Sequence, residues 1–103
     1  MTTTIKRVKT VPYEQELYQD LKNSPDEAIE YVNLSLEKPD EPELFLIALR
    51  HLAEAWGFTS LATETGLNRE SLYKMLSQKG NPKLSSLLTL LDGLGLRLAV
   101  IKK

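Results

Sequence analysis

The chain has 103 residues, a formal net charge of −1, one histidine and no cysteine, so its length is that of one domain with a core of limited size. The lack of cysteine excludes a disulfide framework and a thiolate metal site. No apolar run reaches the roughly 20 residues of a membrane helix, and the first residues lack the apolar region of a secretory signal. We therefore expect a cytoplasmic protein with no cofactor, no bound metal and no membrane partner.

Catalytic patterns are also missing from the sequence. It contains no evident set of paired acid and base, activated nucleophile or metal ligands. The one histidine, His51, stands without a cluster of carboxylates, and we expect it to be a structural or surface residue. We therefore predict that the protein is not an enzyme and takes no small-molecule substrate.

Charge is divided unevenly along the chain. Residues 1–57 carry a net charge of −5 and residues 58–103 a net charge of +4. Such asymmetry is typical of a protein whose basic half faces nucleic acid and whose acidic half faces another partner, although a split of this size also arises by chance in small proteins.

The first 41 residues divide into two parts. Residues 1–12 show no helical period, and we expect a flexible arm or a short extended segment there. Residues 13–41 form an acidic front segment, the expected partner-binding part, with two predicted helices. The first covers Tyr13–Lys22. The second is capped by Ser24, starts at Pro25 and runs to about Glu37, with an apolar face of Ala28, Ile29, Val32 and Leu36.

Residues 42–103 form the second predicted unit. A helix over Pro42–Trp56, capped by Asp40, carries the strongest apolar stripe and is the expected central helix. Three more helices are expected after Gly57, over Ser60–Thr65, Arg69–Ser77 and Leu84–Leu94.

The end of the chain, Leu96–Lys102, alternates and is β-branched near its end, which predicts a short strand. A single strand cannot satisfy its own backbone groups, so it needs a partner. That partner is either the Ile5–Val11 segment or the same strand of a second chain, and the second choice gives a symmetric homodimer.

The segment from Thr59 to Pro82 predicts a helix-turn-helix. Ala62 is small where two helices approach, and Gly66 stands where the chain must bend between them. The apolar residues that would hold helix to helix are Leu61, Leu67, Leu72 and Met75.

A helix that enters the major groove of double-stranded DNA reads bases with its first turns. The predicted base-reading residues are Asn68, Arg69, Glu70, Tyr73 and Lys74, on a face opposite Leu72, Met75 and Leu76. Hydroxyls, lysines and free backbone amides on either side predict phosphate contacts from Thr59, Ser60, Ser77, Lys79, Asn81 and Lys83.

Simpler interpretations stand beside this one. Glu70 and Lys74 are four residues apart in the favourable order and form an exposed ion pair under this alternative. Thr59 or Ser60 and Asn68 are also expected helix caps, and capping alone would explain them.

The motifs LATETGLNRESLYKMLSQKGNP and LSSLLTLLDGLGLRLAV, with the capped acidic front, resemble the HigA-like addiction module antidote proteins over about residues 13–101. These belong to the XRE-type, lambda-repressor-like helix-turn-helix class. The resemblance implies an all-α bundle of five to six helices, here with the short C-terminal β-strand predicted above. Thr65 departs from the pattern, because many such proteins have an aliphatic residue there.

The same resemblance implies the function. It implies an antitoxin that binds and inhibits a RelE-like ribonuclease toxin and, as a dimer on a palindromic operator, represses the promoter the two genes share. It implies DNA contacts at Ser60, Asn68, Arg69, Glu70, Tyr73, Lys74 and Asn81. The alternatives are a stand-alone XRE-type transcriptional regulator and a helical interaction module without DNA binding, which the sequence pI of about 5.8 favours modestly.

Overall fold

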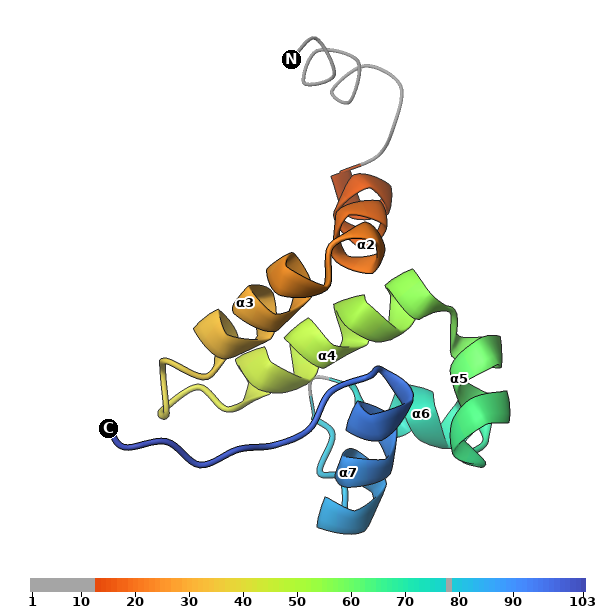
Figure 1. Cartoon of the computed structure of the whole chain (residues 1–103). Helices are drawn as coiled ribbons and strands as arrows, with labels where there is room; N and C mark the ends of the chain where they lie inside the picture. The colour runs from red at the N-terminus through yellow and green to blue at the C-terminus, as the bar shows by residue number, and fades with distance from the viewer. Residues whose placement is uncertain (1–12, 78) are drawn as a thin grey trace, which may run out of the picture.

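In a computed structural model of the chain, residues 13–77 and 79–103 can be described, and the arm predicted for residues 1–12 lies outside them. The described residues form six α-helices and no strand (Figure 1), so the all-α prediction holds for them. The helices are α2 (Tyr13–Asn23), α3 (Pro25–Ser35), α4 (Glu43–Trp56), α5 (Phe58–Thr65), α6 (Arg69–Met75) and α7 (Leu84–Gly93).

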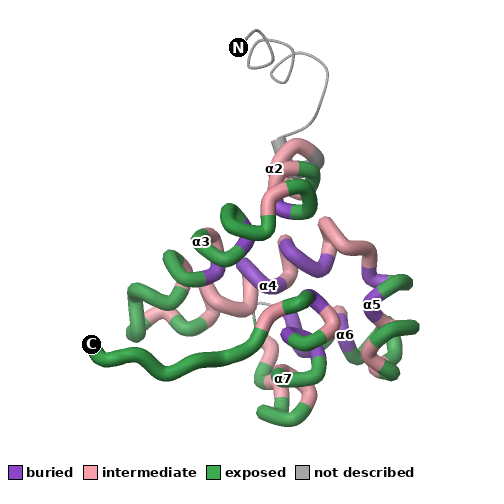
Figure 2. The backbone as a smooth tube through the Cα atoms, in the orientation of Figure 1, coloured by how far each residue is buried: buried purple, intermediate pink, exposed green. Residues whose placement is uncertain are grey.

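Helix α4 lies at the centre of the molecule, as its apolar stripe predicted. Helices α2 and α3 pack against it and against each other, while α5 packs against α4, α6 and α7. Leu49, Leu52 and Ala53 of α4 have no exposed surface. Figure 2 shows the buried residues following α4 through the middle of the fold. The acidic front segment and the helices that follow therefore share one core.

Helix α3 begins as its sequence predicts and buries a narrower face than expected. The Glu27 amide donates to the Ser24 hydroxyl at 3.4 Å, and Pro25 occupies the first turn. Ala28 is buried. Ile29 and Leu36, predicted for the same face, are 45% and 49% exposed. The prediction was wrong for both, because Ile29 is one position away from the stripe that meets α4 and Leu36 follows the last helical residue.

His51 joins three helices. The Tyr31 hydroxyl and His51 Nδ1 are hydrogen-bonded at 2.5 Å, which links α3 to α4. The ring of Tyr18 on α2 lies 6.0 Å from the His51 ring. The imidazole thus lies where the front segment meets α4. This position agrees with the expectation that His51 is a structural residue.

The start of α4 differs from the prediction. The helix follows Pro42 without any side-chain cap, so Asp40 does not have the expected role. A turn takes its place, with the Glu41 amide donating to the Lys38 carbonyl at 2.9 Å. At the other end Gly57, with φ +96°, separates α4 from α5.

The strand predicted for Leu96–Lys102 is not formed in the single chain. Gly95, with φ +79°, ends the turn after α7, and the Leu96 amide donates to the Leu91 carbonyl at 2.8 Å. Leu96 packs against the core, and the following residues are exposed. The strand prediction was wrong for the isolated chain, because the described residues contain no other strand whose edge could pair with it.

Candidate nucleic-acid interface

Helices α5 and α6 are joined by a tight turn at Gly66, which takes the left-handed conformation with φ +77°. The Gly66 amide donates to the Ala62 carbonyl at 3.0 Å. Thr65 fastens the same turn, because its hydroxyl donates to the Leu61 carbonyl at 2.6 Å and accepts from the Leu67 amide at 3.2 Å. The threonine that departs from the aliphatic pattern is therefore a satisfied part of the turn.

Replacing Gly66 with valine should lower the free energy of unfolding by more than about 1–2 kcal/mol, the usual cost of a left-handed residue with a Cβ. The cause is the backbone angle alone, because a Cβ at Gly66 would meet no atom within 4 Å. Denaturant unfolding measures the loss. Gly66→Asn is the matched control and should lose less, since asparagine tolerates this conformation; equal stability of Gly66→Val and the native chain would contradict the turn.

Helix α6 has one buried and one exposed face, as predicted. Asn68 is its N-cap, with the Ser71 amide donating to Oδ1 at 2.7 Å. Leu72 and Leu76 have no exposed surface and Met75 is buried. The exposed residues near its outer face are Asn68, Arg69, Glu70, Ser71 and Lys74. The helix ends at Met75, two residues before the predicted end, and the Ser77 hydroxyl donates to the Lys74 carbonyl at 2.9 Å.

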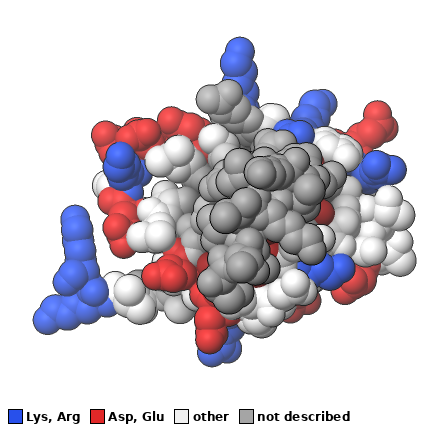
Figure 3. Space-filling view, turned by 90° about the horizontal axis from the view of Figure 1, so that it is seen from above, with Lys and Arg blue, Asp and Glu red and all other residues white. Residues whose placement is uncertain are grey.

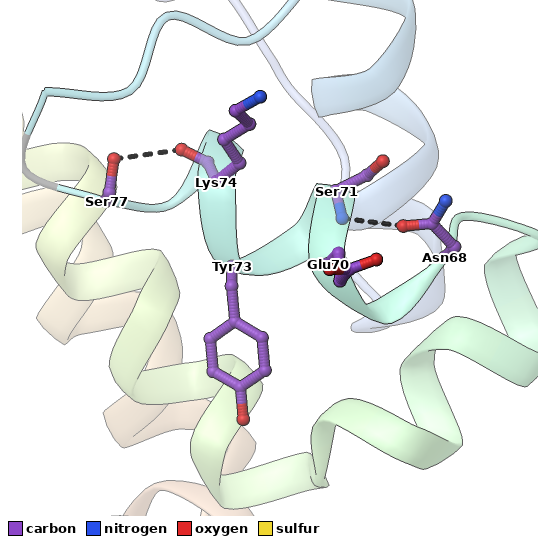
Figure 4. A pocket seen from close by; sticks show the side chains of 6 residues that line it. All are labelled: Asn68, Glu70, Ser71, Tyr73, Lys74 and Ser77. Carbon is purple, nitrogen blue, oxygen red and sulfur yellow. Dashed lines mark hydrogen bonds between the residues drawn. The ribbon is translucent and has the colours of Figure 1, made fainter.

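An open hollow of about 600 Å³ lies along this helix (Figure 4). Its lining brings together five of the predicted site residues and adds Ser71: the full set is Asn68, Glu70, Ser71, Tyr73, Lys74 and Ser77. Ser71 was missed by sequence reasoning, although its place one turn above Asn68 is a signal for it. All the residues that line the hollow have a polar group in the side chain.

Tyr73 was placed on the outer face, and the structure corrects this. It is half-buried, and its ring is stacked on Phe58 of α5 with centroids 4.1 Å apart and planes tilted by 13°. Figure 4 shows Tyr73 pointing away from Lys74. The ring is thus part of the contact between α5 and α6, and only its remaining surface faces the hollow.

Two arginines lie over the Tyr73 ring. The guanidinium carbon of Arg69 is 5.9 Å from its centroid and that of Arg50, on α4, is 5.8 Å away. Cations at this distance are attracted to the face of an aromatic ring. Arg50 also lies 4.0 Å from the Glu54 carboxylate. Sequence reasoning missed Arg50, because no spacing along the chain connects it with α6.

Of the predicted phosphate contacts, Ser77 lines the hollow and the others lie outside it. Thr59 and Ser60 are exposed in the first turn of α5, which begins at Phe58, so neither is the cap that was expected. Their amides belong to the first turn, where a helix leaves N–H groups unpaired. Lys79, Asn81 and Lys83 are exposed between α6 and α7.

Gly80 shapes that connection. The Gly80 amide donates to the Ser77 carbonyl at 2.8 Å. A Cβ on Gly80 would come within 3.0 Å of the backbone oxygens of Met75 and Ser77. A glycine is therefore needed for the chain to fold back so closely over the end of α6.

Other kinds of site are missing from the described part of the chain. Residues 13–77 and 79–103 contain no group of three or more His, Asp or Glu side chains that could hold a metal ion. None of the helices described is both long enough and apolar enough to cross a membrane.

Comparison with known proteins identifies the family. The model of a family described as "Probable addiction module antidote protein" matches residues 14–102. A protein from Haemophilus influenzae (strain ATCC 51907 / DSM 11121 / KW20 / Rd), described as "Uncharacterized protein", is 36% identical over 77 residues, which cover 75% of this chain and 78% of the relative. No solved structure matches the chain. The chain belongs to the family of probable addiction module antidote proteins.

Proposed function

We propose that this protein is the antitoxin of a type II toxin–antitoxin module. In this role it binds and neutralises a RelE-like ribonuclease, and as a dimer it represses its own operon through α6. The family supports the antidote role, since an antidote implies a toxin to bind and a binding rather than a catalytic activity. The observation that carries the DNA-binding part is the exposed polar face of α6 above a fully buried apolar face.

The exposed face of α6 has the side chains that read base edges. Arg69 is suited to the O6 and N7 atoms of guanine, and Glu70 to the amino group of cytosine. Asn68 and Lys74 complete this set around the hollow. Tyr73 serves as a platform for Arg69, because its ring is held by Phe58.

Phosphate contacts would come from several elements. The first turn of α5 offers the hydroxyls and amides of Thr59 and Ser60. The connection after α6 offers the exposed side chains of Lys79 and Asn81 and the half-buried Ser77. Arg50 joins them from α4, since its guanidinium lies over the same ring as that of Arg69.

The outer face of α3 is the proposed toxin-binding surface. Residues 13–41 hold nine acidic and two basic side chains. Exposed apolar side chains lie among them, with Ile29, Leu34 and Leu36 at 45%, 56% and 49% exposure. Acidic side chains gather on the left of Figure 3, the side on which α3 lies in Figure 1. An RNA-cleaving toxin is basic where it meets RNA, and such a face complements it in charge and offers apolar contact area.

Replacing Leu34 with aspartate should weaken toxin binding by about 2 kcal/mol or more, the effect of a central interface residue. The extra negative charge cannot itself oppose a basic partner, so the loss would come from the apolar contact. Titration calorimetry with the neighbouring toxin measures it, with Asn33→Asp as control for charge. Normal toxin binding by Leu34→Asp would contradict the proposal that the outer face of α3 binds the toxin.

One assay tests the proposed function as a whole. The purified chain is titrated with DNA from upstream of its own gene at two salt concentrations, with and without the product of the adjacent reading frame. Specific, salt-sensitive binding that changes with that product is the expected result. Binding that ignores the product would indicate a stand-alone regulator, and no binding would leave only the protein-interaction role.

A further inference from the structure

The last eight residues, 96–103, are here called the tail. Beyond Leu96, the described residues of the tail make no backbone hydrogen bond with other described residues. The side chains of Leu98, Val100 and Ile101 are 46%, 100% and 85% exposed. Unpaired backbone groups together with exposed β-branched side chains are typical of a strand that lacks its neighbour.

We propose that the tail pairs antiparallel with the tail of a second copy of this chain, around a two-fold axis that passes through Ala99. An antiparallel pair related by a two-fold axis must bring one residue opposite itself. With Ala99 at the axis, residues 97–101 face residues 101–97 of the second copy. Only residues beyond Leu96 are used, so Leu96 keeps its place in the core.

This register also matches the side chains. Directly opposite residues in an antiparallel pair lie on the same face of the ribbon. Leu98 therefore meets Val100 of the second copy, and the reverse pair repeats this contact on the other side of the axis. Arg97 lies opposite Ile101 of the second copy, so the two Arg97 side chains do not lie opposite each other. The smallest side chain of the segment, Ala99, lies at the axis.

A toxin and DNA are two other possible partners of the tail, and both fit it less well than a second copy. The tail carries Arg97, Lys102 and Lys103 and no acidic residue, so charge does not favour a basic toxin over a second copy, and a second copy has the register that places Arg97 opposite Ile101. DNA phosphates would be attracted to these cations and would leave Val100 and Ile101 in water.

The N-terminal arm is the remaining occupant. The arm joins the chain at the start of α2. Figure 1 draws α2 above α4 and the tail below it, so the arm joins the fold on the side of α4 opposite the tail. A two-stranded ribbon also needs a helix to cover its apolar face. Leu84 and Leu88 of α7, 64% and 43% exposed, are apolar side chains on the helix that precedes the tail. A second copy therefore supplies the missing strand.

The inference deepens the proposed function, because a two-fold pair presents two α6 helices to a two-fold operator. Its test needs neither DNA nor toxin. Sedimentation of the full chain should show a dimer, and Val100→Glu should raise the dimer dissociation constant at least tenfold. Val100 has no contact to lose in the single chain, so its helical signal and unfolding should not change. Lys103→Glu, outside the paired residues, is the control and should remain dimeric.

Cysteine variants test the register, because the natural chain has no cysteine. Under mild oxidation Ala99→Cys should form a disulfide dimer with itself. Leu98→Cys and Val100→Cys should do so poorly alone and readily when mixed. A monomeric native chain, or a Val100→Glu variant that dimerises normally, would overturn the pairing. Preferential self-linkage at residue 98 or 100 would overturn the register. Loss of operator binding with the dimer intact would instead count against the DNA-binding proposal.

Discussion

Arg69→Ala is expected to weaken binding to the cognate operator by about 1–3 kcal/mol and to relax the preference at one base position. Arg69 is exposed at the start of α6, and its guanidinium carbon lies 5.9 Å from the centroid of the Tyr73 ring. From this position its planar fork can form two hydrogen bonds to a guanine. Arg69→Lys retains the charge but not the fork, so it should lose most of the base preference while keeping binding to unrelated DNA. Competition titrations with operator and unrelated duplexes measure both effects.

Arg50 is the matched comparison, because it lies at nearly the same distance from the same ring. As a phosphate contact, Arg50→Ala should weaken binding to all sequences alike and reduce the slope of log affinity against log salt by about one. Glu54→Gln removes the carboxylate beside Arg50 and should leave the slope unchanged or increase it. A sequence-dependent loss in Arg50→Ala, or a uniform loss in Arg69→Ala, would reverse the assigned roles.

Much of the α5–α6 region follows from local sequence. Asn68 caps α6 by accepting a hydrogen bond from the amide of Ser71, three residues further along the chain. The buried Leu72 and Leu76 follow at a helical spacing. The bend at Gly66 likewise depends on one backbone angle. Such features need only neighbours along the chain, which is why the residue pattern predicts them.

The contacts that involve Tyr73 have a different origin. Phe58, Tyr73 and Arg50 come from three helices, and their meeting depends on how α4, α5 and α6 cross. The helical period alone put Tyr73 outside. It also put Ile29 on the inner face of α3. The helical period gives the direction of the apolar face of a helix, but it does not give the width of that face that a neighbouring helix buries. The tail shows the same limit, since strand propensity does not supply a partner.

Phe58→Ala is expected to lower the free energy of unfolding by about 3–5 kcal/mol, the usual cost of removing a buried phenyl group. Phe58 is 4% exposed, belongs to the main core and is stacked on Tyr73. Native domains have only about 5–15 kcal/mol in total, so the variant should be partly unfolded at moderate denaturant concentration. Chemical denaturation followed by circular dichroism measures the change, with Thr59→Ala, exposed on the next position, as the control.

Variants of Tyr73 separate the platform from a direct DNA contact. Tyr73→Phe keeps the stacked ring, so both stability and operator affinity should stay close to those of the native chain. Tyr73→Ala removes the stack and should cost at least the 0.5–1.5 kcal/mol of an aromatic pair in stability, and it should weaken operator binding by releasing Arg69. If Tyr73→Phe loses operator affinity while its stability is unchanged, the hydroxyl itself contacts DNA and the platform role is wrong. If instead Tyr73→Ala and Arg69→Ala are additive in a double variant, the ring does not act through Arg69.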